Sequence, residues 1–279
     1  MEVKIAKNAG FCFGVKRAMK MAWDELQDSE DGIYALGPLI HNKQAVLKYE
    51  ENGLKTINEV DDVPEYKSMI IRSHGVGENV YKDSEIKNLD IIDTTCPFVK
   101  KIHEIAKNHY KNGYKIIVIG DSKHPEVIGI NGWCNNEAII IKTIEDLENI
   151  EFDKSKKYCV VSQTTINVDL YNQIIGELSN RLDDVLFNNT ICSATKVRQE
   201  SARKISQEVD MMIVVGGKHS SNTQKLVQIC KEYVPTLAIE TVDELTDEDF
   251  KNFNNIGLTA GASTPDWIIE EVLNYLKSI

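Results

Sequence analysis

The stretch NAGFCFGVKRA, residues 8–18, recurs in altered form as DTTCPFVKKI, residues 93–102, and as NNTICSATKVRQ, residues 188–199. Each copy places a cysteine after an apolar stretch and before an amphipathic segment with a basic start; the cysteines are Cys12, Cys96 and Cys192. Repetition at a long period indicates an array of equivalent units. Because the period here has the size of a small domain, the sequence predicts three related small domains and not a solenoid.

Two further landmarks recur between the cysteines. An apolar run ends in glycine and a polar cluster in ALGPLIHN (35–42), VIGDSKHPEV (118–127) and VVGGKHSSN (214–222). A later apolar run ends in a second polar cluster in MIIRSHGVG (69–77), CVVSQTTIN (159–167) and IGLTAGASTPD (256–266). The same order in all three copies strengthens the prediction of equivalent units.

The apolar runs are short and nearly continuous, which is typical of strands covered on both faces. The predicted strands are Tyr34–Leu36, Met69–Ile71, Lys115–Ile119, Ala138–Ile141, Tyr158–Val161, Met211–Val215 and Ile256–Leu258. Helical spacing follows Cys12 and Cys96, so strands and helices alternate. This alternation predicts an α/β fold of three small parallel-sheet α/β/α units joined by right-handed crossovers.

The boundaries between the units are expected near two of the cysteines, because no linker rich in Pro, Gly or Ser separates them. The predicted units span residues 1–96, 97–192 and 193–279. The opening strand, Val3–Ala6, either belongs to the first unit or completes the third, so residues 1–13 are open to both assignments.

Composition excludes several classes of function. The net charge of −11 argues against a nucleic-acid partner. No apolar stretch has the length of a membrane span, and the N-terminus lacks the apolar core of a secretory signal. A cytoplasmic location without membrane attachment is therefore expected, and disulfides are not expected in that compartment.

In open parallel sheets, ligands bind outside the carboxyl ends of the strands, where every repeated polar cluster lies. If the units pack around a pseudo-threefold axis, Cys12, Cys96 and Cys192 converge on one cleft. Thiolates suit iron–sulfur clusters and zinc, and three of them leave one metal open to substrate. The competing interpretation, small buried hydrophobic residues, fits Cys159 and Cys230 better, and Cys134 is expected in a turn without a role.

The other polar clusters indicate an anion pocket. Histidines follow predicted strands at His41, His74 and His124, and the third unit offers hydroxyl and amide groups at Ser220, Ser221, Asn222 and Ser263. Such donors beside helix N-termini bind anions. Few lysines are involved, so a compact anion such as a diphosphate fits better than a polymer backbone. The second unit adds Thr164 and Thr165; His103 and His109 are expected to be structural, and His219 is ambiguous.

Glu126 is the one carboxylate beside a histidine in these clusters, in KHPEV. It is either an acid in the first turn of a helix, favoured by the helix dipole, or the proton donor of the cleft.

At this point the chain resembles the 4-hydroxy-3-methylbut-2-enyl diphosphate reductase family almost from end to end. The resemblance rests on AGFCFGVKRA, GPLIHN, RSHGV, DTTCPFV, GDSKHPEV, SQTT, TICSAT–RQ, GGKHSSN and TAGASTPD. It implies a trefoil of three α/β units around one central [4Fe–4S] cluster, with three irons held by the three repeated cysteines and an open fourth iron for the substrate hydroxyl.

The resemblance also implies roles for the other clusters. His41, His74, His124, Ser220, Ser221, Asn222 and Ser263 would hold the diphosphate of an allylic substrate. Glu126 would deliver protons, with Thr164, chosen over Thr165 by aligning SQTT, near the substrate hydroxyl. The implied reaction is a two-electron reductive dehydroxylation to isopentenyl and dimethylallyl diphosphate, the last step of the methylerythritol phosphate pathway.

A nucleotide-binding glycine fingerprint is missing from the sequence, so the electrons are expected from an external protein such as ferredoxin or flavodoxin. Two other classes of function stay open on the residues alone. One is a zinc-dependent hydrolase of a phosphorylated small molecule, and the other is a non-catalytic iron–sulfur sensor.

Overall fold

The computed structural model describes residues 2–29 and 32–279 of the chain. They form two compact units. The first comprises residues 2–16, 40–51 and 193–279, and the second comprises residues 17–29, 32–39 and 52–192. None of the helices in the described part of the chain combines the length and apolar character that a membrane crossing requires.

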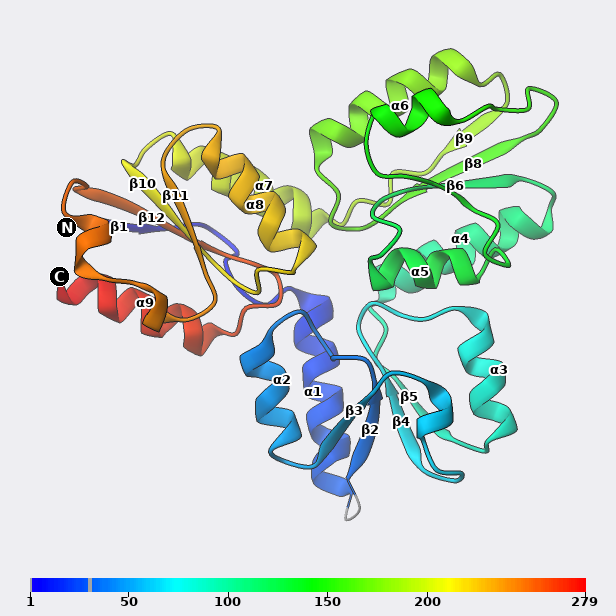
Figure 1. Cartoon of the computed structure of the whole chain (residues 1–279), viewed down its shortest axis with the longest axis horizontal. Coiled ribbons are helices and arrows are strands. Elements are labelled where there is room, and N and C mark those ends of the chain that lie inside the picture. Colours follow the sequence, from blue (N-terminus) through cyan, green and yellow to red (C-terminus); the bar gives the residue numbers. More distant parts are fainter. Residues whose placement is uncertain (1, 30–31) are drawn as a thin grey trace. The chain divides into compact units, whose positions relative to one another are not determined.

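The first unit contains one four-stranded parallel sheet. Its order is β1 (Glu2–Ile5), β12 (Asn255–Ala260), β10 (Met211–Val215) and β11 (Thr236–Ile239). The helices of this unit are α2 (Lys43–Glu50), α7 (Ser193–Ser206), α8 (Ser221–Lys231) and α9 (Asp266–Ser278), with 3-10 turns η3 (Val242–Glu244) and η4 (Asp247–Phe250). Helix α9 packs on one face of the sheet, and α7 and α8 pack on the other (Figure 1).

The second unit contains two four-stranded parallel sheets. One has the order β3 (Leu54–Ile57), β2 (Ile33–Leu36), β4 (Ser68–Ile71) and β5 (Asp90–Asp93). The other has the order β7 (Ile139–Ile141), β6 (Lys115–Ile119), β8 (Tyr158–Ser162) and β9 (Val185–Phe187).

Helices cover both faces of these sheets. Most of α1 (Phe13–Asp28), α3 (Glu78–Ile86) and the turn η1 (Val60–Asp62) accompany the β2–β5 sheet, and α3 packs on Met69 and Ile71 of β4. In the β6–β9 sheet, α6 (Val168–Arg181) and the turn η2 (Glu145–Asn149) cover one face, while α4 (Pro97–Lys111) and α5 (Pro125–Gly132) cover the other (Figure 1). The prediction of three related parallel α/β units is confirmed.

The three sheets share one strand order. If the strands of each repeat are numbered in chain order, every sheet has the order second, first, third, fourth, as in β3-β2-β4-β5 and β7-β6-β8-β9. In the sheet of the first unit the fourth place is taken by β1, which pairs with β12 from Glu2↔Asn255 to Ile5↔Leu258. The opening strand therefore completes the sheet of the last repeat.

Each cysteine of the repeat directly precedes a helix. Cys12 precedes α1, Cys96 is the N-cap of α4, and Cys192 precedes α7. Helix α4 shows why the sequence folds in this way, because Pro97 opens it with a fixed φ and its apolar residues recur on one buried face. The parallel topology thus brings all three cysteines to the carboxyl edges of their own sheets.

Candidate functional site

One hydrogen bond recurs at all three cysteines. The backbone N–H of Cys12 donates to the carbonyl oxygen of Ala262 at 3.1 Å, that of Cys96 to Ser73 at 3.0 Å, and that of Cys192 to Thr164 at 3.1 Å. Each acceptor lies in the loop after the third strand of the same sheet, one residue from or at a predicted substrate residue. The cysteine loops and the substrate loops are therefore joined in the same way three times.

None of these three cysteines forms a disulfide, and all three are half-buried. The N–H of Val15 points at Cys12 Sγ from 3.5 Å, which is the geometry of a cysteine capping the start of α1. In contrast, Cys134, Cys159 and Cys230 are fully buried, and burial raises the pKa of Cys134 to about 12 and that of Cys159 to about 11.

Glu126 and Thr164 form a buried, hydrogen-bonded pair in the second unit. The Thr164 N–H donates to Glu126 Oε1 at 2.6 Å, and the Thr164 hydroxyl donates to Oε2 at 2.7 Å. Glu126 is 2% exposed and Thr164 is 7% exposed. Burial raises the pKa of Glu126 to about 7, although both hydrogen bonds from Thr164 act to lower it. With a pKa close to 7, the acid exists in both its protonated and its ionised form near neutral pH, which suits a group that donates a proton and regains it.

The neighbouring threonine has a different partner. The Gln163 amide donates to the Thr165 hydroxyl at 2.9 Å, and Gln163 Oε1 accepts the N–H of Asp121 at 3.2 Å. Gln163 is 1% exposed and ties the loop before His124 to the loop that carries Thr164. This bridging role of Gln163 was not predicted, and its only signal in the sequence is the position of Gln163 within SQTT.

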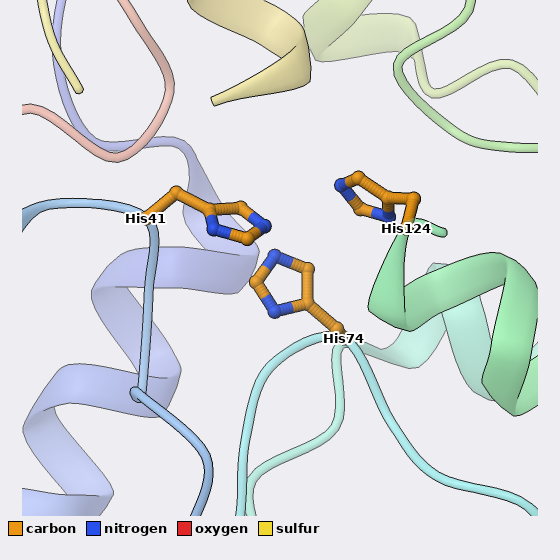
Figure 2. Close-up of side chains that lie close together, drawn as sticks. All are labelled: His41, His74 and His124. Carbon is orange, nitrogen blue, oxygen red and sulfur yellow. The ribbon is translucent and has the colours of Figure 1, made fainter. Parts of the chain in front are cut away.

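His124 is the N-cap of α5, and its Nδ1 accepts the N–H of Glu126 at 3.1 Å. The proton of the neutral imidazole therefore resides on Nε2, which leaves that nitrogen as a donor. The ring of His74 meets the ring of His124 edge to face, with centroids 5.4 Å apart (Figure 2). Because α5 is also anchored by a hydrogen bond from Trp133 Nε1 to the Val76 carbonyl at 2.9 Å, the two histidine loops are fixed to each other.

In the first unit, three loops gather around the backbone of His41. The Ser263 hydroxyl donates to the His41 carbonyl oxygen at 3.2 Å. A Cβ at Gly217 would lie 2.4 Å from the same oxygen, so this close approach requires glycine. Ser220 caps α8, Ser221 begins it, and Asn222 follows in its first turn at 5% exposure. The Asn222 Nδ2 is buried, with no hydrogen-bond partner among the described residues.

The two histidines that were expected to be structural, His103 and His109, lie on α4, as the helical spacing after Cys96 predicted. His103 is 4% exposed, and desolvation lowers its pKa to about 4. His109 Nδ1 lies 2.9 Å from the carbonyl oxygen of Ile105, one helical turn earlier. His219, the ambiguous one, is exposed in the loop before α8.

The buried acid gives the free energy of unfolding a pH dependence. Because the pKa of Glu126 is raised from 4.5 to about 7 on folding, its contribution is fully present below about pH 4.5 and is lost as the pH rises through 7. The loss is on the order of 3 kcal/mol. We expect urea unfolding of the metal-free protein at pH 5 and pH 8 to show a larger drop in the parent than in Glu126→Gln. Parallel drops would contradict a raised pKa at this position.

Three small parallel α/β sheets, each with polar loops and a cysteine directly before a helix at its carboxyl edge, define the class of protein. The family model described as LytB protein matches residues 3–277. The chain is 66% identical over 279 residues to 4-hydroxy-3-methylbut-2-enyl diphosphate reductase of Clostridioides difficile (strain 630), and 50% identical over 283 residues to the protein of that name from Alkaliphilus oremlandii (strain OhILAs). Both alignments cover all of each chain.

Two solved structures resemble the fold. The E-1-hydroxy-2-methyl-but-2-enyl-4-diphosphate reductase of Plasmodium falciparum matches with a TM-score of 0.94 and 33% identity, over 99% of this chain and 88% of the other. A second structure, (E)-4-hydroxy-3-methyl-but-2-enyl diphosphate reductase, the terminal enzyme of the non-mevalonate pathway, matches with a TM-score of 0.72 and 41% identity, over 100% and 99%. The chain belongs to the LytB family of 4-hydroxy-3-methylbut-2-enyl diphosphate reductases.

Proposed function

We propose that the chain reduces 4-hydroxy-3-methylbut-2-enyl diphosphate to isopentenyl and dimethylallyl diphosphate, with loss of water, as the last step of the methylerythritol phosphate pathway. Family membership supports the substrate and the reaction class. The observation that carries the proposal is the buried acid Glu126, whose pKa is raised to about 7 and which is hydrogen-bonded to Thr164. A reductive dehydroxylation needs a proton source of this kind for the departing hydroxyl.

We propose further that Cys12, Cys96 and Cys192 hold one [4Fe–4S] cluster with an open fourth iron. The residues fit the group, because all three are cysteines outside any disulfide at the starts of helices and their backbones are held by equivalent hydrogen bonds. When bound, the cluster supplies electrons singly and an open iron for the substrate hydroxyl. We also propose that the three units, 1–96, 97–192 and 193–279 with β1 joining the last, form a trefoil around this cluster.

The protein residues supply the proton and the orientation. In the structure the Thr164 hydroxyl donates to Glu126 Oε2 at 2.7 Å. For proton delivery, the protonated carboxyl would donate from Oε2 to Thr164 Oγ1, while the hydroxyl turns and gives its own proton to the substrate oxygen. The Thr164 N–H at Oε1 keeps the carboxyl in one orientation during this exchange. Because the pair is buried, bulk water does not compete for the proton at this step.

The diphosphate is assigned to His41, His74, His124, Ser220, Ser221, Asn222 and Ser263. His124 and Ser220 cap helices α5 and α8, whose N-termini favour negative charge. The buried Asn222 Nδ2 is a donor that an anionic oxygen would satisfy.

Replacing Asn222 with alanine is expected to weaken substrate binding by about tenfold to a hundredfold, because a hydrogen bond to a charged group contributes roughly 1.5–3 kcal/mol. Calorimetric titration with the substrate measures the effect, and Asn108→Ala on the exposed side of α4 is the control. The loss should shrink for the same alcohol without its diphosphate. Equal losses for both ligands would assign Asn222 to the fold instead.

The electrons are proposed to come from an external protein, a ferredoxin or a flavodoxin, and the location is proposed to be cytoplasmic. The partner set of the proposal is therefore an allylic diphosphate and an electron carrier, without nucleic acid or membrane.

A further inference from the structure

Two arginines occupy nearly equivalent places in the repeat. Arg17 lies five residues after Cys12 on α1, and Arg198 lies six residues after Cys192 on α7. Arg17 Nη1 donates to the carbonyl oxygen of Thr95, the residue directly before Cys96, at 3.4 Å. Arg198 Nη2 donates to the carbonyl oxygen of Gly10, two residues before Cys12, at 2.6 Å. Each guanidinium on a helix that follows one cysteine thus binds the loop that leads to another.

Arg198 is the more enclosed of the two, at 3% exposure. Its Nη1 donates to the carbonyl oxygen of Ala194 at 3.1 Å, so the side chain folds back toward the first turn of α7. Ala194 lies two residues after Cys192, and Gly10 lies two residues before Cys12. The guanidinium is therefore held between the chain segments of two cysteines, and it stays charged at every accessible pH.

Arg17 likewise binds the chain segment that leads to the remaining cysteine, Cys96. The carbonyl that it binds belongs to Thr95, which is buried, and the next residue, Cys96, is fixed through its own N–H to Ser73. The described contacts of α4 include no counterpart of this bond from the lysine at the matching place, Lys101, which is exposed. Two of the three cysteine loops therefore receive a fixed positive charge.

We propose that Arg17 and Arg198 are positioning residues that raise the reduction potential of the iron–sulfur cluster held by the three cysteines; this rests on the proposed function. A cluster bound by thiolates becomes more negative by one charge when it accepts an electron. A fixed cation nearby stabilises the more negative state more strongly, especially where water is excluded. Removing the cation should therefore make reduction harder without removing a ligand.

The test compares charge with hydrogen bonding at each site. Arg198→Gln and Arg17→Gln keep a donor but lose the charge, whereas Arg198→Lys and Arg17→Lys keep the charge. The readout is an anaerobic redox titration of the reconstituted protein with dithionite, followed by electron paramagnetic resonance. Each glutamine variant should lower the reduction equilibrium constant about tenfold, which is about 59 mV for one electron. Each lysine variant should stay close to the parent.

Arg181→Gln is the matched control. Arg181 Nη1 also donates to a backbone carbonyl, that of Leu147, at 2.6 Å, but it lies at the C-terminus of α6, the helix end opposite the strand carboxyl edge. The reduction potential of the cluster in Arg181→Gln should equal that in the parent.

Equal potentials in the parent and the glutamine variants overturn the proposal, as do equal shifts in the glutamine and lysine variants. Circular dichroism of the metal-free protein checks folding. If Arg198→Gln does not fold, the comparison of Arg17→Gln with Arg17→Lys at the half-buried Arg17 tests the proposal instead. A parent chain that never assembles a cluster refutes the proposed function itself. A parent that assembles one, with unshifted variants, refutes only the role of the arginines.

Discussion

Replacing Glu126 with glutamine is expected to reduce turnover by at least about a hundredfold, which is roughly 2.7 kcal/mol in the barrier. The glutamine oxygen can still accept the Thr164 N–H, and its amide can donate to Thr164 Oγ1 in place of the bond that Oε2 accepts from that hydroxyl. It resembles the protonated acid in shape but has no acidic proton to deliver. Steady-state turnover with excess chemical reductant measures the effect, and substrate affinity and cluster content should stay near those of the parent.

The pH profile provides the control for this interpretation. Because the pKa of Glu126 is raised to about 7, the proton-carrying form declines as the pH rises through 7, and turnover of the parent should decline with it. The residual turnover of Glu126→Gln should lack that limb. Turnover of the variant within a few-fold of the parent would reduce Glu126 to an acid in the first turn of α5.

Serine in place of Cys12, Cys96 or Cys192 is expected to abolish the cluster in each case, since a neutral hydroxyl does not replace a thiolate as an iron ligand. Iron and acid-labile sulfide are to be measured after anaerobic reconstitution. Cys134→Ala is the control, because that thiol is buried in the core beneath α4 and α5 and its raised pKa keeps it protonated. Full cluster content in any of the three serine variants would remove that cysteine from the ligand set.

The strands that the sequence revealed are mainly the central ones. Lys115–Ile119 and Met211–Val215 match β6 and β10 to the residue, because both are covered on two faces and read as continuous apolar runs. The strands that the prediction missed are β3, β5, β9 and β11, all of which lie at sheet edges. DIID in β5 and LKTI in β3 mix charged and apolar residues and so lack a continuous apolar run, whereas VLF in β9 and TLAI in β11 are short uncharged runs that were not singled out.

In the candidate site, the features that the sequence predicts are local patterns, whereas contacts between distant residues appear only in the structure. Repetition alone placed Cys12, Cys96 and Cys192 at equivalent points, and the structure gives each the same backbone bond to a neighbouring loop. The residues' ligand roles stay predictions. The contact between Glu126 and Thr164 joins residues 38 positions apart, so spacing in the sequence could not predict it. The choice of Thr164 over Thr165 rested on aligning SQTT, and the contact with Glu126 supports that choice.

The arginines show the limit of sequence reasoning most clearly. A basic start after each cysteine is visible in all three repeats, yet lysine and arginine there are more often solvated surface groups. Only the structure shows that Arg198 is buried and reaches a loop 188 positions away.

The central claim is that three cysteines and one buried acid together carry out a reductive dehydroxylation. Its most direct test is one anaerobic assay of the reconstituted protein with dithionite, a redox mediator and 4-hydroxy-3-methylbut-2-enyl diphosphate, with the products separated by chromatography. We predict brown protein and formation of both isopentenyl and dimethylallyl diphosphate. Colourless protein that releases phosphate from the substrate, or brown protein that leaves the substrate unchanged, would contradict the account.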